Sequence, residues 1–163
     1  MRLRFTTALV FFLAAVLGAS AQTKISGTVL CAKPDPMHMV EVGDSPGHAV
    51  SIAQSKCNWT KPMDIAGIQT KEDVDTGVDD VHGGKSRGHG YVVGTMSNGD
   101  KMYVHYHGSA TLKDGAPDTA EGAWEFAGGT GKLKGIKGKG TYKGTAGPDG
   151  ITYEVEGEYT LPQ

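Results

Sequence analysis

After residue 22 the chain alternates between apolar and polar side chains over short segments, and this period of two is typical of β-strands. The last segment shows the pattern most clearly. Ile151, Tyr153 and Val155 point to one face, and Glu154 and Glu156 point to the other. Because such alternation buries one face and leaves the other in water, the segment predicts an antiparallel strand at the surface of a sheet.

The preceding segment predicts a hairpin with this strand. The residues at 147–150, Gly-Pro-Asp-Gly, are a strong turn signal, and a four-residue loop pairs Ala146 with Ile151. The register sets opposite charges across the outer face and aromatic rings over glycines on the inner face, and both arrangements favour it. The predicted pairs are Lys143 with Glu154, Lys139 with Glu158, Gly144 with Tyr153, and Gly138 with Tyr159.

A second hairpin is predicted at Asn98-Gly99, a dipeptide typical of two-residue β-turns. A two-residue loop gives a register in which one face is apolar and the other carries Val92, Gly94, Tyr103, His105 and His107. The pairs predicted on the apolar face are Thr95 with Met102, Val93 with Val104, and Tyr91 with Tyr106.

Further strands are predicted at about 22–30, 48–59, 63–73 and 119–127, the last with Trp124 and Phe126 on one face. The total is eight strands, or nine. Glycines inside the strands mark bends and close backbone approach, which a small closed barrel needs. The sequence therefore predicts an all-β fold, an antiparallel barrel that forms a single domain over residues 22–163.

The N-terminal segment has the three parts of a secretory signal peptide. Arg2 and Arg4 precede the apolar run at 8–17, and Ala19-Ser20-Ala21 is a small-x-small cleavage site. A membrane-spanning helix needs about 20 apolar residues, roughly twice the length of this run. We therefore expect a signal peptide at 1–21, cleavage after Ala21, and a secreted or periplasmic protein without a membrane span.

Charge and cysteine content agree with that compartment. Of 16 basic residues, Arg2 and Arg4 lie in the segment expected to be removed, so 14 basic residues remain against 18 acidic ones. This acidic balance argues against nucleic acid as a partner. The two cysteines, Cys31 and Cys57, predict a disulfide, because an even pair in an exported protein is normally oxidised.

The segment Phe126-Ala127-Gly128-Gly129-Thr130-Gly131, followed by a basic glycine-rich strand up to Gly140, resembles the allene oxide cyclase and dirigent-like barrel superfamily. It is most similar to secreted bacterial proteins of that barrel type with no assigned activity. The resemblance implies an eight-stranded barrel with a central cavity that holds an apolar molecule. We find no match for the cavity acids or arginines of that superfamily, so no catalytic residue is carried over.

His105 and His107 are the candidate metal ligands, since alternation puts both imidazoles on one strand face. The spacing from Gly99 also begins the first cupin motif. The cupin glutamate should then fall at 111 or 112, which are Thr111 and Leu112. We therefore expect no tight metal and no cofactor, and interpret the two histidines as groups at the surface or at the rim of the lumen.

Two further motifs are interpreted as turns. The segment 43–47 matches G-x-S-x-G around Ser45, but a strand-like segment follows it where a hydrolase nucleophile needs a helix. The acidic segment with Asp73, Asp75, Asp79 and Asp80 lacks the glycine and glutamate of a calcium loop. We expect it to be a solvated acidic turn.

The function that these features favour is an exported barrel whose lumen holds a small apolar ligand. One alternative is an enzyme of the cyclase sort, which a buried ionisable group of perturbed pKa in a dry cavity would favour, or of the cupin sort. Another is a structural envelope protein with a barrel filled by side chains. The sequence leaves the ligand and the oligomeric state open. The aromatic residues predicted to line the lumen are Trp124, Phe126, Tyr142, Tyr153 and Tyr159.

Overall fold

The computed structural model describes residues 22–162, so the predicted signal peptide at 1–21 lies outside the described residues. The described chain is built almost entirely of strands, with one 3-10 helix, η1 (Gly131–Leu133). The strands are β1 (Thr23–Ala32), β2 (Met37–Glu41), β3 (Ala49–Lys61), β4 (Asp64–Ile65), β5 (Ile68–His82), β6 (Lys85–Met96), β7 (Lys101–Lys113), β8 (Ala116–Gly129), β9 (Lys137–Gly147) and β10 (Gly150–Thr160).

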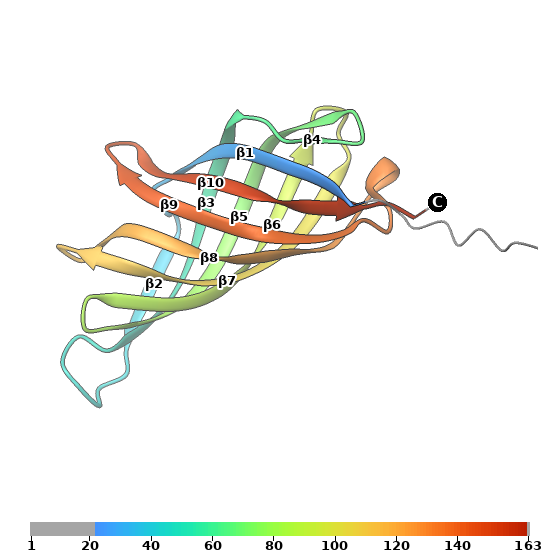
Figure 1. Cartoon of the computed structure of the whole chain (residues 1–163). Coiled ribbons are helices and arrows are strands. Elements are labelled where there is room, and N and C mark those ends of the chain that lie inside the picture. Colours follow the sequence, from blue (N-terminus) through green and yellow to red (C-terminus); the bar gives the residue numbers. More distant parts are fainter. Residues whose placement is uncertain (1–21, 163) are drawn as a thin grey trace, which may run out of the picture.

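Eight of these strands close into an antiparallel barrel (Figure 1). Neighbouring strands pair from β5 through β10, β10 pairs with β1, and β3 pairs with both β1 and β5 to complete the ring. The short strands β2 and β4 lie outside the ring, on the edges of β3 and β5. The prediction of an eight-stranded all-β barrel is confirmed.

The predicted register of β9 and β10 is also confirmed. Ala146 pairs with Ile151, Lys143 with Glu154, and all the other predicted pairs of this hairpin are present. The side chain of Glu154 is exposed and Tyr159 is buried, as the alternation requires. Opposite charges outside and large rings over glycines inside therefore fixed this register correctly.

The predicted register of β6 and β7 is wrong by one residue. Val93 pairs with Tyr103, not with Val104. The loop is longer than two residues: Gly99 donates its N–H to the Met96 carbonyl at 3.0 Å, and the Met96 N–H reaches the Asp100 carbonyl at 2.9 Å. Gly99 has φ +88°, so it takes the left-handed position of a three-residue loop, and the extra residue moves the partners by one.

This shift changes which side chains of β6 face the lumen. Gly90, Val92 and Gly94 point inward, whereas Tyr91 and Val93, predicted on the apolar face, are exposed on the outside. On β7 the residues of the predicted apolar face, Met102, Val104 and Tyr106, do point inward.

The strand predicted at 63–73 is also corrected. The chain turns at Ala66-Gly67, which have φ of 55° and 76°, and the long strand β5 then runs from Ile68 to His82. The acidic segment expected to be a solvated turn lies inside this strand.

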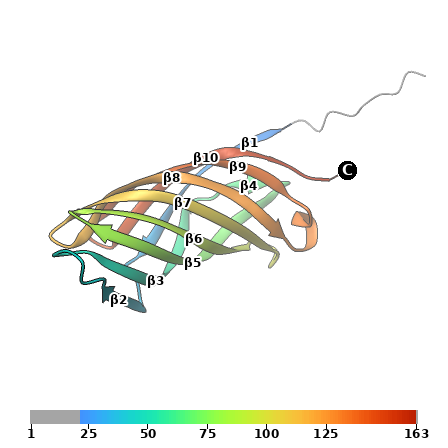
Figure 2. The same ribbon diagram turned by 90° about the horizontal axis from the view of Figure 1, so that it is seen from below.

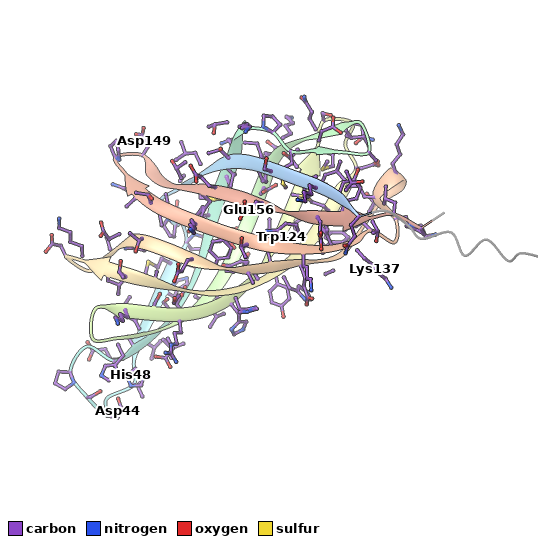
Figure 3. The ribbon with its side chains drawn as sticks, viewed as in Figure 1. Asp44, His48, Trp124, Lys137, Asp149 and Glu156 are labelled. Atoms are coloured by element: carbon purple, nitrogen blue, oxygen red, sulfur yellow. A yellow bond between two sulfur atoms is a disulfide. The ribbon has the colours of Figure 1, made fainter. Side chains whose placement is uncertain are left out.

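A hydrophobic core closes one end of the barrel. Ile65 from β4 and Leu133 from η1 are fully buried there, against Met96 and Met102. The glycine-rich turn between β8 and β9 contains η1 and carries Leu133 into the core. In Figure 3, Lys137 marks this closed end, and Asp149, Asp44 and His48 lie toward the opposite end.

The predicted disulfide is present between Cys31 on β1 and Cys57 on β3. The two residues are direct partners in the strand ladder, so the bond crosses the place where the barrel closes. Both are buried and pack with Val29 and Trp59. Within residues 22–162, no helix is long and apolar enough to cross a membrane.

Candidate functional site

The barrel encloses a cavity of about 670 Å³ on the open side of the core. Its inner part is lined by Trp59, Met102, Trp124 and Phe126. Its mouth lies between the ends of the hairpins that project on the left in Figure 1, together with the segment after β1. Figure 2 shows the same strands after a turn of 90°, seen from below.

Four of the five aromatic residues predicted to line the lumen border this cavity, namely Trp124, Phe126, Tyr142 and Tyr153. Tyr159 instead belongs to the core at the closed end, where its hydroxyl accepts the N–H of Ala66 at 2.9 Å. Whether the four residues contact a ligand stays a prediction.

The cavity is hollow because its large side chains lie across glycines in the barrel wall. A Cβ atom at Gly77 would sit 2.6 Å from the Tyr106 hydroxyl, and one at Gly144 would sit 2.5 Å from the Tyr153 ring. Real Cβ atoms do not approach so closely, so only glycine allows these rings to lie against the wall. An eight-stranded barrel is otherwise narrow enough for side chains to fill.

Three carboxyl groups from β5 point into the cavity, those of Asp73, Asp75 and Asp79. Their strand partners are small or apolar: Asp75 faces Ser55 on β3 and Val92 on β6. The expectation of a solvated acidic turn is therefore wrong, because these carboxyl groups lie on the inner face of a barrel strand.

Asp73 is the most deeply placed of the three, with 7% of its surface exposed. Its Oδ2 accepts the indole N–H of Trp59 at 2.9 Å, whereas its Oδ1 has no hydrogen-bond partner in the described structure. Burial raises the pKa of Asp73 to about 7, the Trp59 hydrogen bond opposes this shift, and the negative charge of Asp75 adds to it.

Asp75 lies two residues further along β5, toward the mouth of the cavity, and one of its carboxyl oxygens, Oδ1, is likewise without a hydrogen-bond partner within residues 22–162. Burial raises the pKa of Asp75 to about 6, hydrogen bonding by Tyr106 lowers it, and the charge of Asp79 raises it further. Asp79 Oδ1 accepts a hydrogen bond from Ser86 Oγ at 3.2 Å.

Three tyrosines form an edge-to-face row beside the carboxyl groups. Ring centroids are 6.0 Å apart for Tyr106 and Tyr142, and 5.7 Å apart for Tyr142 and Tyr153. Burial, and then the charge of Asp75, raises the pKa of Tyr142 to about 12 and raises the pKa of the other two as well. The phenols therefore stay protonated at neutral pH and can donate hydrogen bonds into the cavity.

His105 and His107 lie on the outer face of β7, exposed and away from the cavity. Because of the shifted register, His105 pairs with Tyr91 on β6, and His107 pairs with His89. No group of three or more potential ligands in the described part of the chain is arranged to hold a metal ion. That the two histidines bind no metal tightly stays a prediction.

The G-x-S-x-G segment forms the loop between β2 and β3, as the turn interpretation expects. Ser45 Oγ lies 3.3 Å from His82 Nε2, and His48 Nδ1 lies 2.6 Å from Asp44 Oδ1. The loop leads into a strand and not a helix, so the strand–turn–helix elbow of a hydrolase nucleophile is absent at this segment.

Comparison with known proteins supports the fold and leaves the activity open. No family model and no curated protein matches the chain. A protein of unknown function from the DUF3224 family of Shewanella oneidensis MR-1 is similar in structure, with a TM-score of 0.52 and 14% identity over 88% of this chain and all of its own. A conserved protein of unknown function from Rhodopseudomonas palustris has a TM-score of 0.54 and 11% identity over 86% of this chain and 99% of its own.

A pyocyanin demethylase has 19% identity over 81% of this chain and 98% of its own, with a TM-score of 0.41. At these identities the two likenesses above 0.5 support the fold alone.

The sequence did contain a signal for the missed carboxyl groups. Asp73 and Asp75 alternate with Val74 and Thr76, so period two was present. The alternation alone does not predict inward carboxyl groups, because the inner face of a strand is expected to be apolar. In this strand the polar side chains face inward.

Proposed function

We propose that this protein is an exported barrel that binds one small, largely apolar molecule in its lumen. The observation that carries the proposal is the hollow, aromatic-lined cavity, open at one end, on whose wall Asp73 and Asp75 hold carboxyl oxygens without partners. Ligand sites are typically apolar cavities with a few polar groups that fix the orientation of the ligand.

The size of the cavity supports this proposal. Its volume of about 670 Å³ lies within the ~300–1,000 Å³ usual for sites that hold drug-sized molecules. The same cavity argues against the alternative of a structural protein with a filled barrel. The glycines beneath Tyr106 and Tyr153 favour the same conclusion, because larger residues there would push the rings into the lumen.

We further infer that residues 22–163 form a single domain of the allene oxide cyclase and dirigent-like superfamily, exported after removal of residues 1–21. The closed eight-stranded barrel and the glycine-rich turn at 126–138 support the first inference. The three-part pattern of residues 1–21 and the Cys31–Cys57 disulfide support the second, since disulfides persist in oxidising compartments.

Native mass spectrometry of protein purified from its own periplasm or medium tests the proposal directly, and we expect a retained small molecule at one per chain. Fluorescent anthracene derivatives provide a second measurement. Ala110→Trp, which places an indole in the lumen, should abolish their binding, whereas Thr152→Trp on the outer face should leave it unchanged. No retained molecule, together with no binding of any derivative, would contradict the proposal.

A second candidate is an acid–base enzyme of the cyclase sort acting on the bound molecule. The specific observation that favours it is the pair of buried carboxyl groups with pKa values of about 7 and 6, near the range of general acids and bases. This candidate requires a product. Incubation of the retained molecule with the protein and with the Asp75→Asn variant should then change its mass or chromatographic position only in the first case. The cupin alternative has less support, because His105 and His107 face away from the cavity.

A further inference from the structure

We propose that the molecule held in the lumen carries a positively charged nitrogen, bound by the carboxyl groups of Asp73 and Asp75, while the aromatic wall holds its apolar body. This inference rests on the proposed function and specifies the chemical class of the ligand, an organic amine with an aromatic or polycyclic body.

The first support is the charge of the cavity. Three carboxyl groups line it, and among the described lining residues Lys33 is the one basic side chain. Lys33 is exposed on the segment after β1, at the mouth, so it does not reach a position between Asp73 and Asp75 deep in the lumen. A cavity of this polarity favours a cation and disfavours an anion.

The second support is the pair of oxygens without partners. Asp73 Oδ1 and Asp75 Oδ1 are both buried, and neither is reached by a donor from the described chain. Buried polar atoms are nearly always hydrogen-bonded, so two exceptions two residues apart on one strand point to a donor that binds from outside. An ammonium group has three N–H donors and can satisfy both oxygens at once.

The third support is that the wall around these carboxyl groups leaves room for such a donor. Asp73 lies between Cys57 and Gly94 on the two neighbouring strands, and Asp75 lies between Ser55 and Val92. None of these side chains is basic. Asp73 has one donor from the protein, Trp59, and Asp79 has one, Ser86. One buried oxygen of Asp73 and one of Asp75 are left without a partner from the described chain.

The fourth support is the aromatic surface beside the carboxyl groups. Trp59 donates to Asp73, and Tyr106 interacts with Asp75, so both rings border the position of the proposed nitrogen. Ring faces attract cations, and this attraction increases where water is excluded. An aromatic amine would therefore gain from the carboxyl groups and from the rings at the same position.

The experiment compares three anthracene derivatives that differ in one group: anthracenylmethylamine, anthracenylmethanol and anthracene carboxylate. Binding is measured by fluorescence titration at pH 8 to the full mature protein. We expect the amine to bind at least tenfold more tightly than the alcohol, and the carboxylate to bind most weakly. In Asp73→Asn/Asp75→Asn the preference of the amine over the alcohol should disappear, while binding of the alcohol is retained.

Asp80→Asn is the matched control, because Asp80 lies on the same strand with its side chain outside the barrel. It should leave the preference unchanged. Retained alcohol binding shows that the double variant is folded, and its circular dichroism spectrum provides an independent check.

The pH dependence gives a second readout. Between pH 5 and 8 Asp73 and Asp75 ionise while the amine stays protonated, so the affinity for the amine should increase with pH. The other ionisable groups that face these carboxyl groups are Asp79 on β5 and Tyr106, Tyr142 and Tyr153 on the opposite strands. The affinity for the alcohol should change little over this range.

The outcomes separate the two proposals. Equal binding of the amine and the alcohol to the wild-type protein would overturn the inference while leaving a small-molecule lumen in place. An amine preference that survives in the double variant would also overturn it, because the carboxyl groups would not be its cause. Failure of all three derivatives to bind, with no molecule retained from the native source, would overturn the proposed function and this inference with it.

Discussion

Replacing Asp73 with asparagine should make the protein more resistant to unfolding at alkaline pH and should remove part of its pH dependence. Asparagine has nearly the same shape and keeps an oxygen that can accept the Trp59 indole N–H, but it cannot ionise. The wild-type carboxyl group must ionise in a buried site next to Asp75, and this is unfavourable in the folded state only.

The sign follows from the direction of the shift. The pKa of Asp73 is raised from 3.8 to about 7 in the folded protein, so between these values the folded state binds more protons than the unfolded state. The contribution of Asp73 to stability is therefore fully present at low pH and is lost as the pH rises toward 7. The full shift corresponds to about 4 kcal/mol, of which about 3 kcal/mol is lost between pH 5 and 8.

Urea unfolding of the wild-type protein and of Asp73→Asn at pH 5 and pH 8 measures this difference. The new amide N–H₂ of asparagine has a desolvation penalty, but it is the same at both pH values and cancels. We expect the advantage of the variant to increase by about 3 kcal/mol between pH 5 and 8, a change in midpoint of about 1–3 M urea. Parallel pH profiles for the two proteins would show that Asp73 ionises as freely in the folded state as in the unfolded chain.

Two other predictions concern the disulfide between β1 and β3 and the histidines on the outer face of β7. The Cys31→Ala/Cys57→Ala variant should lose about 3.5 kcal/mol of stability, because the disulfide closes a loop with a sequence separation of 26. Equal urea midpoints for the oxidised wild-type protein and the variant would contradict this prediction. His105 and His107 should bind zinc, nickel and manganese no better than weakly in tag-free protein, since His89, the strand partner of His107, does not complete a group of three ligands within the described residues. Submicromolar, one-to-one binding by isothermal titration that both His105→Ala and His107→Ala abolish would overturn this prediction.

The fold could be predicted well where local chemistry and burial agree. In β9 and β10 the glycines, the tyrosines and the Lys–Glu pairs all favour one register, and that register is present. The hairpin at Asn98-Gly99 is compatible with two loop lengths. A glycine with positive φ fits both a two-residue turn and a three-residue loop with a bulge, and the sequence does not distinguish the two. One extra loop residue then reversed the faces assigned to Tyr91 and Val93.

The candidate site was harder to predict because it violates the rule used to find strands. On β5 the inward positions are Asp73, Asp75, Gly77 and Asp79, and apolar Val74 is exposed on the outside. Pattern recognition assigns the apolar side of such a strand to the core. A binding cavity reverses that assignment, because its polar groups serve a ligand and not the stability of the fold.

The two ends of the barrel therefore contribute differently to the protein. The closed end, with Ile65 and Leu133 fully buried, stabilises the fold through close packing. The lumen beyond it lacks that packing and holds carboxyl groups that are unfavourable when ionised. If the cavity were an accident of packing, Asp73→Asn would stabilise the protein without any other effect. If the lumen binds an amine, the same substitution should stabilise the empty protein and weaken the binding of the amine. Opposite effects on stability and on binding are therefore the outcome that we expect for Asp73→Asn.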